Sequence, residues 1–245
     1  MSRIEATFSR LKEEKRKAFI PFITAGDPHY DASLDILLQL PEQGADLVEL
    51  GMPFTDPMAD GPAIQKAAQR ALESGMNLKK VLEMAAAFRA KHADTPLILM
   101  GYYNPIYNFG ADEFCKQAAN AGVDGLLIVD LPPEEDRELR QPAQENGLDL
   151  IRLITPTTDE ARLNIILSHS SGFLYYVSIT GVTGTKKADF SKVAKHMDMI
   201  QNHTDIPLAV GFGIRTPDDV RAIPARAQAV VVGSAIVDGL EAVNN

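Results

Sequence analysis

The run Gly125-Leu126-Leu127-Ile128-Val129 decides how this chain folds, because it is almost continuously apolar over the length of one strand. A half-exposed strand alternates apolar and polar residues, whereas a parallel strand covered on both faces does not. The run Ala229-Val230-Val231-Val232 has the same character. Both runs therefore predict parallel strands buried between other layers of structure.

Working outward from these two runs, we find six more short apolar segments, which makes eight in all: 19–24, 46–50, 96–100, 125–129, 149–154, 173–178, 207–212 and 229–233. Helical patterns separate most of them, which indicates repeated βα units. Eight such units predict an α/β fold, a closed (β/α)8 TIM barrel, and a doubly wound open sheet is the alternative. The 245 residues match the ~250 residues of one such barrel. We expect a single catalytic domain over residues 1–245.

Two regions depart from the regular alternation. Helical patterns at Ile64–Leu72 and Leu78–Arg89 both lie between the second and third strands, so an extra helix is expected there. The segment 220–225 is short for a barrel helix, and few residues follow the eighth strand. We therefore expect a shortened C-terminal end with a short last helix, whether the chain is clipped or abbreviated there.

The segment Leu47–Pro62, LVELGMPFTDPMADGP, carries the most informative chemistry. Glu49 lies inside the second apolar run, and burial raises a carboxyl pKa toward neutral pH, which suits a general acid or base. The alternative is a buried ion pair. Three prolines shape the loop that follows, so Asp56 and Asp60 have defined places. Asp60 is either a second functional carboxylate or a cap for the helix that starts at Pro62.

Three glycine-rich segments follow the last three strands: Ser178–Thr185, Gly211–Ile214 and Gly233–Val237. Glycine lets backbone amides approach an anion, and a helix starting at Ser234 adds the attraction of its dipole. Each segment alone is typical of a turn. The three in this order predict a phosphate site in the late loops of the barrel.

The remaining strand ends are mostly apolar or aromatic, which suits a flat hydrophobic substrate. The aromatic segment 102–109 is expected to be a loop on the same rim, either a lid on its own barrel or a surface for a protein partner. Asp130 follows the fourth strand in Asp-Leu-Pro-Pro, and we expect a structural role for it.

Several classes of function are disfavoured. None of the eight expected strands contains a lysine, which disfavours an aldolase that forms a Schiff base with its substrate. The five histidines lack paired spacing, which disfavours a metal site, and only His29 falls in a rim loop. Cys115 lies in a helical pattern and is expected to be inert packing.

Charge and hydropathy limit the partners further. A net charge of -9 argues against nucleic acid, whose binding needs clustered Lys and Arg. No apolar stretch approaches the ~18 residues of a membrane span. A single cysteine and an N-terminus without signal-peptide character predict a cytoplasmic protein.

From Phe19 to Val237 the chain resembles the tryptophan synthase α chain family. The resemblance rests on motifs in the family's order: Phe19–Pro28, Glu49–Gly61, Gly181–Gly184, Gly211–Ile214 and Gly233–Val237. It implies a lyase of L-tryptophan biosynthesis that cleaves indole-3-glycerol phosphate to indole and glyceraldehyde 3-phosphate. This retro-aldol reaction needs no metal and no cofactor in the chain.

The resemblance also implies roles for individual residues. Glu49 would be the acid-base residue, Asp60 would accept the indole N–H, and Thr183 would meet Asp60 when its loop closes. The indole would be surrounded by Phe22, Met100, Leu127, Tyr175 and Phe212, and the phosphate would be bound by Gly184, Gly213, Gly233 and Ser234.

A partner is implied as well, a tryptophan synthase β chain that carries pyridoxal phosphate, receives the indole, and forms an α2β2 heterotetramer. Asp56, Pro57, Met58 and the Tyr102 to Phe109 segment are the expected contacts. Two alternatives stay open at this point: a sugar-phosphate isomerase barrel, and a catalytically weak subunit that activates a partner.

Overall fold

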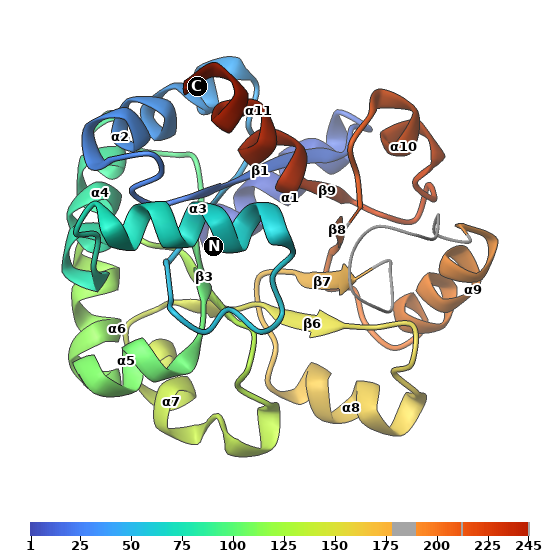
Figure 1. The fold of residues 1–245 in the computed structure, drawn as a ribbon. Coiled ribbons are helices and arrows are strands. Elements are labelled where there is room, and N and C mark those ends of the chain that lie inside the picture. The colour runs from blue at the N-terminus through green and yellow to red at the C-terminus, as the bar shows by residue number, and fades with distance from the viewer. Residues whose placement is uncertain (178–189, 212, 245) are drawn as a thin grey trace.

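The computed structural model describes residues 1–177, 190–211 and 213–244, and all strands found there run parallel in one sheet (Figure 1). The strands are β1 Ala18–Thr24, β2 Val48–Gly51, β3 Leu97–Gly101, β4 Gly125–Ile128, β5 Asp149–Leu150, β6 Arg152–Ile154, β7 Leu174–Val177, β8 Leu208–Gly211 and β9 Ala229–Val232. Their order is β5-β4-β3-β2-β1-β9-β8-β7-β6.

This order closes a barrel, because the two ends of the sheet belong to one stretch of chain. β5 pairs with β4 and β6 pairs with β7, and only Ile151 separates β5 from β6. The Ile151 N–H donates to the Leu126 carbonyl at 2.9 Å and keeps the stretch attached to β4. The (β/α)8 barrel is confirmed, the open sheet is wrong, and the fifth expected strand is divided in two.

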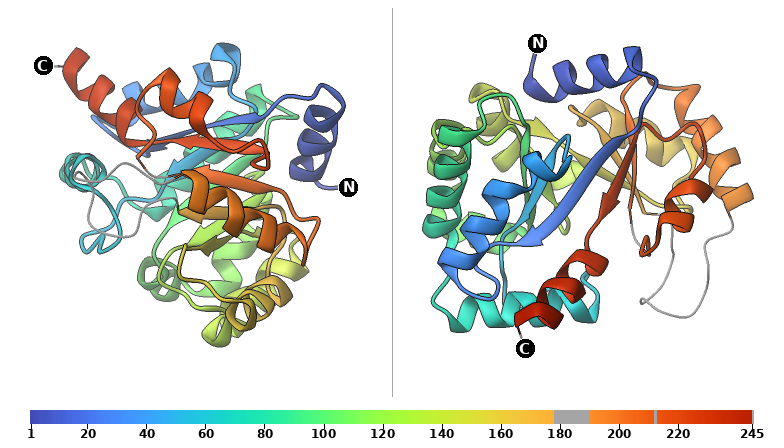
Figure 2. Two further views of the ribbon diagram at one scale, coloured as in Figure 1. Left: turned by 90° about the vertical axis from the view of Figure 1, so that its right-hand side faces the viewer. Right: turned by 90° about the horizontal axis from the view of Figure 1, so that it is seen from above.

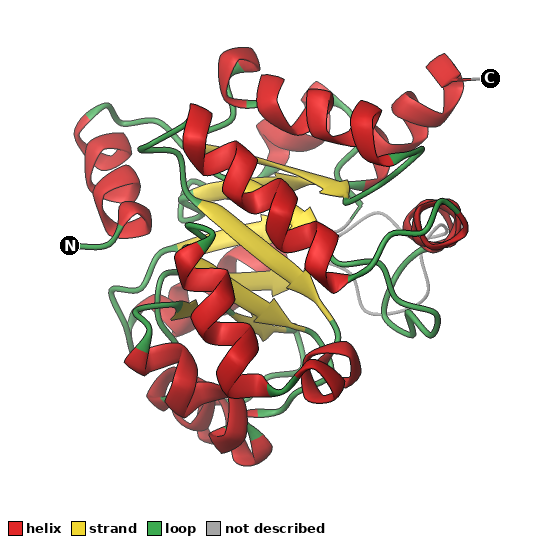
Figure 3. Ribbon diagram, turned by 90° about the vertical axis from the view of Figure 1, so that its left-hand side faces the viewer, coloured by secondary structure: helices red, strands yellow, loops and turns green. Residues whose placement is uncertain are grey.

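The helices form a layer outside the strands (Figure 3). They are α1 Arg3–Glu13, α2 Tyr30–Gln39, α3 Pro62–Glu73, α4 Leu78–Lys91, α5 Tyr103–Phe109, α6 Ala111–Asn120, α7 Arg137–Glu145, α8 Glu160–Ser168, α9 Phe190–Gln201, α10 Pro217–Ala222 and α11 Ser234–Asn244, with short 3₁₀ turns at Pro41–Gln43 and Pro133–Glu135. The extra helix after the second strand is confirmed, because both α3 and α4 lie between β2 and β3. The short helix expected near 220–225 is α10, and α11 fills the short C-terminal segment.

The aromatic segment 102–109 is not a loop, so that expectation is wrong. Seven of its residues form α5, whose first N–H, on Tyr103, donates to the Asp130 carboxylate at 2.8 Å. The side chain of Ile106 is buried, and Gly110 ends the helix with φ 92°. Tertiary packing and this contact stabilise a helix that the local mixture of Tyr, Asn and Pro does not favour.

The barrel has a closed end and an open end. Ile4, Phe8 and Leu11 of α1 pack into the interior cluster of the barrel, and Ser2 reaches the Asp149 carboxylate, where β5 begins. Figure 2 shows this N-terminal helix at one end and the C-terminus at the other. The carboxyl ends of the strands therefore lie at the open end, where barrel active sites are built.

Strand geometry directs Glu49 into the barrel. Side chains alternate along a strand, and Val48 and Leu50 belong to the cluster beneath the outer helices, whereas Leu47 belongs to the interior cluster. Glu49 thus shares the inward face with Leu47. Its register partner on β1 is Phe22, which also lies in the interior cluster. In the described part of the chain, none of the helices combines the length and apolar character needed to cross a bilayer.

Candidate active site

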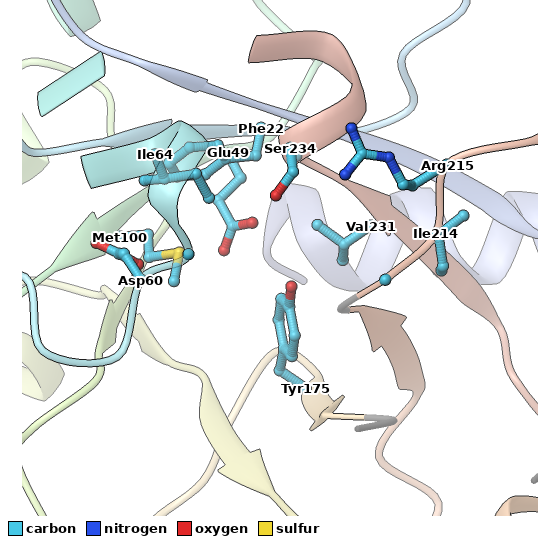
Figure 4. A pocket seen from close by; sticks show the side chains of 13 residues that line it. Phe22, Glu49, Asp60, Ile64, Met100, Tyr175, Ile214, Arg215, Val231 and Ser234 are labelled. Carbon is cyan, nitrogen blue, oxygen red and sulfur yellow. The ribbon is translucent and has the colours of Figure 1, made fainter. Parts of the chain in front are cut away.

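A pocket opens among the carboxyl ends of the strands and collects most of the predicted site residues (Figure 4). Its described lining comprises Phe22, Glu49, Asp60, Gly61, Ile64, Met100, Tyr175, Gly213, Ile214, Arg215, Val231, Gly233 and Ser234. Eight of these were predicted from the sequence, and they come from β1, β2, β3, β7, the loops after β2, β8 and β9, and the start of α11. The fold therefore brings residues together across most of the chain.

Glu49 is a buried carboxyl at the bottom of this pocket. Its exposed fraction is 1%, and neither of its carboxyl oxygens has a hydrogen-bond partner among the described residues. Burial, together with a smaller effect from the nearby charge of Asp60, raises the pKa of Glu49 to about 8. None of the described residues forms an ion pair with Glu49, and the raised pKa keeps a proton on it at neutral pH.

Asp60 supplies the second carboxyl of the pocket. Burial raises its pKa to about 6, while a hydrogen bond from the Tyr102 hydroxyl lowers it. The same hydroxyl accepts the Ala59 N–H at 3.0 Å, which holds the loop beside Tyr102. The cap of α3 is Gly61, with no side-chain hydrogen bond, and Pro62 at its first position lacks an N–H. Asp60 is thus not the helix cap, and the pocket holds two carboxyls with separated pKa values.

Apolar side chains form the walls around these carboxyls, and two glycines make room for them. A Cβ at Gly51 would overlap the ring of Phe22, and a Cβ at Gly211 would overlap the hydroxyl end of Tyr175. Burial raises the pKa of Tyr175 well above its ordinary value, so its hydroxyl stays neutral. In Figure 4 the hydroxyl of Tyr175 points into the pocket toward the carboxyl of Glu49.

Backbone rich in glycine forms the opposite end of the pocket. Gly213 has φ 78°, a left-handed conformation in which a side chain would be strained. Gly233 accepts the N–H groups of Ile236 and Val237 at 2.8 and 3.1 Å, so α11 begins at Ser234. The first N–H groups of a helix have no partner within it and can bind an anion.

Some predicted residues are not placed in the pocket. Thr183, Gly184 and Phe212 lie outside the described residues. Leu127 is fully buried in the interior cluster and does not line the pocket formed by the described residues. The role expected for each of these four stays a prediction.

The other five lining residues were not predicted as site residues: Gly61 and Ile214, which end motifs noted in the sequence, and Ile64, Val231 and Arg215. Alternation along the eighth run could have indicated Val231, and Ile64 lies within the first turn of the helix after Asp60. Arg215 directly follows the Gly-Phe-Gly-Ile motif and is the first charged residue after β8.

The residues set aside on sequence grounds have structural roles. Asp130 binds the first N–H of α5, as expected for a structural residue. The His29 Nδ1 accepts the Ala32 N–H at 3.4 Å and caps α2. Cys115 is fully buried, which raises its thiol pKa to about 12 and makes it unreactive. No group of three His, Cys, Asp or Glu able to hold a metal occurs among the residues described.

A protonated carboxyl beside a second carboxyl, between apolar walls at the open end of the barrel, defines an acid-base enzyme of the (β/α)8-barrel class. The family model for the tryptophan synthase alpha chain matches residues 8–245. The chain belongs to the tryptophan synthase alpha chain family.

Solved structures agree with this assignment. A tryptophan synthase subunit alpha from Legionella pneumophila is 41% identical, with a TM-score of 0.91 and coverage of 100% of this chain and 91% of that one. Tryptophan synthase from Mycobacterium tuberculosis in an aminoacrylate-bound form is 30% identical, with a TM-score of 0.90 and coverage of 99% and 93%. Another M. tuberculosis structure is 33% identical, with a TM-score of 0.91 and coverage of 98% and 92%.

The family defines the reaction. Its members are lyases that cleave indole-3-glycerol phosphate in tryptophan biosynthesis and pair with a β chain, to which the indole passes. The alpha subunit carries no cofactor, and pyridoxal phosphate belongs to the β subunit. The sugar-phosphate isomerase alternative is therefore wrong.

Proposed function

We propose that this chain cleaves indole-3-glycerol phosphate with Glu49 as the acid-base residue and Asp60 as the carboxylate that stabilises the cationic ring. One observation carries the proposal: a fully buried carboxyl, with no hydrogen-bond partner among the described residues, faces the same pocket as a second carboxyl of lower pKa. A buried polar group without a partner is costly to stability, so its retention indicates a partner supplied by the substrate.

Glu49 moves the protons of the reaction. Protonated at neutral pH, it donates its proton to carbon C3 of the indole ring, which forms a cationic indolenine and leaves Glu49 as a carboxylate. That carboxylate then takes the proton of the side-chain hydroxyl as the carbon–carbon bond breaks. The bonding electrons return to the ring, the hydroxyl carbon becomes the aldehyde, and Glu49 regains its proton.

Asp60 stabilises the positive charge that develops on the ring. With a pKa of about 6 it is charged at neutral pH, and its carboxylate accepts a hydrogen bond from the indole N–H. The Tyr102 hydroxyl favours the charged form by donating to it. Burial strengthens this charge–charge attraction, because little water is present to screen it.

The indole ring and the phosphate of the substrate are assigned to different parts of the pocket. Phe22, Met100 and Tyr175 provide the apolar walls that an indole ring needs, and we assign Leu127 and Phe212 to the same wall. Gly213, Gly233 and Ser234 are assigned to the phosphate, together with Gly184. We assign Thr183 to the contact with Asp60 on loop closure. The positions of Thr183, Gly184 and Phe212 lie outside the described residues.

We infer that the β chain contacts the rim around Asp56, Pro57, Met58 and helix α5. Met58 is 83% exposed and Tyr107 on α5 is 59% exposed, which is unusual for large apolar side chains. A hollow lined by residues 54–58 and by one side of α3 lies beside them. We further propose that the chain and the β chain form an α2β2 assembly. We place this assembly in the cytoplasm, and the phosphorylated substrate supports that location.

The test of the function is indole release from indole-3-glycerol phosphate by the purified chain, with and without a tryptophan synthase β chain. We expect release by the chain alone and faster release with the partner. A catalytically weak subunit that only activates its partner would release no indole alone, and it would still stimulate indole consumption by the β chain. Absence of both effects from a folded sample would contradict the proposal.

The pH dependence of kcat/KM should be bell-shaped, with a maximum near pH 7. Activity rises as Asp60 loses its proton near pH 6 and falls as Glu49 loses its proton near pH 8. The substrate phosphate also titrates near pH ~6. Tyr102→Phe separates the two causes, because losing the hydroxyl raises the pKa of Asp60 and leaves the phosphate unaffected. The acid limb should move to higher pH in this variant; an unmoved acid limb would exclude Asp60 as its source.

A further inference from the structure

Arg215 is a charged residue held in a fixed place at the rim of the pocket. The side chain of the preceding residue, Ile214, is buried. The N–H of Arg215 donates to the Asp219 carboxylate at 3.1 Å. Asp219 also forms a capping box with Thr216 at the start of α10. The backbone of Arg215 is therefore anchored on both sides, while its side chain is 58% exposed.

The guanidinium of Arg215 lies beside the first turn of α11. It forms an ion pair with Asp238, which is four residues after Ser234 and so lies on the same face of the helix. Figure 4 shows the guanidinium pointing toward Ser234 across the pocket. Among the described residues that line the pocket, Arg215 is the only one with a positively charged side chain.

We propose that Arg215 binds the phosphate group of the substrate and exchanges Asp238 for it when the pocket fills. The proposal rests on the proposed function, since it assigns the phosphate to the glycine-lined end of the pocket. An independent observation indicates that this pocket is built for a ligand, because the carboxyl of Glu49, which has no hydrogen-bond partner in the described part of the chain, faces it.

The exchange is favoured by charge. The Arg215 and Asp238 side chains are 58% and 40% exposed, and ion pairs as exposed as this are weak. A phosphate dianion carries more charge than a carboxylate and accepts two parallel N–H bonds from a guanidinium. Asp60 and the net charge of -9 repel a dianion, and the amides around Gly233 offer only partial charges. Arg215 supplies a full positive charge that no other described residue of the lining carries.

The position of Arg215 assigns it to binding rather than to bond cleavage. Glu49 acts at the ring carbon, whereas Gly233 and Ser234 hold the far end of the substrate. A contact with the phosphate stabilises the bound substrate and the transition state alike, so its loss raises KM more than it lowers kcat. Arg215 then sets the preference for a phosphorylated substrate over its unphosphorylated alcohol.

The test uses glycerol 3-phosphate, which carries the phosphate without the indole. Its dissociation constant is measured by calorimetry for the full chain and for Arg215→Gln, Arg215→Lys and Arg221→Gln, with indole as a second ligand. Arg221 is a matched control, because it is an exposed arginine paired with Asp218 on α10 and does not line the pocket. Steady-state kcat and KM for indole-3-glycerol phosphate are measured for the same proteins.

We expect Arg215→Gln to weaken glycerol 3-phosphate binding about tenfold and to raise KM similarly, with Arg215→Lys in between. Indole affinity in Arg215→Gln and both affinities in Arg221→Gln should stay unchanged. Equal phosphate affinity in the Arg215 and Arg221 variants would overturn the proposal, as would an equal loss of indole affinity in Arg215→Gln. Weakened phosphate binding in a chain without lyase activity would support the role of Arg215 and contradict the proposed function instead.

Discussion

Replacing Glu49 by glutamine is expected to lower kcat for indole release about 10³-fold or more. The amide keeps the shape of the side chain but can neither donate a proton to the ring nor take the hydroxyl proton. Both proton transfers of the proposed cycle are therefore lost together. The measurement is single-turnover and steady-state indole release, with the isolated chain and with a β chain. Near-normal turnover in either assay would remove Glu49 from the mechanism.

Stability measurements on the same variant show that it is folded and test the pKa of Glu49. The folded state raises the pKa from 4.5 to about 8, so between these values the folded chain binds more protons than the unfolded chain. The contribution of Glu49 to stability is thus fully present below pH 4.5 and decreases as the pH rises toward 8. Glutamine does not titrate, so the variant does not undergo this decrease.

We therefore expect Glu49→Gln to match the unsubstituted chain in free energy of unfolding at pH 4 and to exceed it at pH 8. The pH trend itself is the control, because a general packing defect would lower stability equally at both values. A difference in stability between variant and parent that is the same at both pH values would show that the pKa of Glu49 is not raised, so that Glu49 is charged at neutral pH. In that case the proton needed for the ring carbon would come from another group.

The features that the sequence predicted are those set by local pattern. A continuous apolar run indicates a buried parallel strand from its own residues alone, without knowledge of its neighbours in the fold. The eight strands and the barrel could therefore be predicted. Glu49 was found because a carboxyl in such a run is an anomaly that packing does not explain. Asp60 was found because the prolines around it restrict the loop.

The features that escaped prediction depend on distant residues. The break at Ile151 exists because its two sides pair with different neighbours, β4 and β7, and neither pairing is visible in the run itself. Helix α5 forms where Asp130, from the next strand, binds its first N–H. Arg215 approaches the pocket because its side chain pairs with Asp238 on α11.

Asp136, outside the active site, lies at the centre of a charged cluster that was also invisible in the sequence. It is 1% exposed and pairs with Arg152 on β6, while the Arg140 Nε donates to it at 2.9 Å and the His169 Nδ1 lies 3.3 Å away. Arg152 in turn donates to the carbonyls of Leu131 and His169, each at 3.2 Å. The cluster fastens the loop after β4 and the end of α8 to the strand beside the break.

Replacing Asp136 by alanine should lower the free energy of unfolding by about 3–5 kcal/mol, because it leaves the buried guanidinium of Arg152 without its counter-charge. The matched control is Asp218→Ala, which removes an exposed partner of Arg221 and should change stability by less than about 0.5 kcal/mol. Urea unfolding followed by circular dichroism measures both. If the two variants unfold at the same urea concentration, the buried cluster does not stabilise the fold, and closure of the barrel beside Ile151 depends on backbone pairing and apolar packing alone.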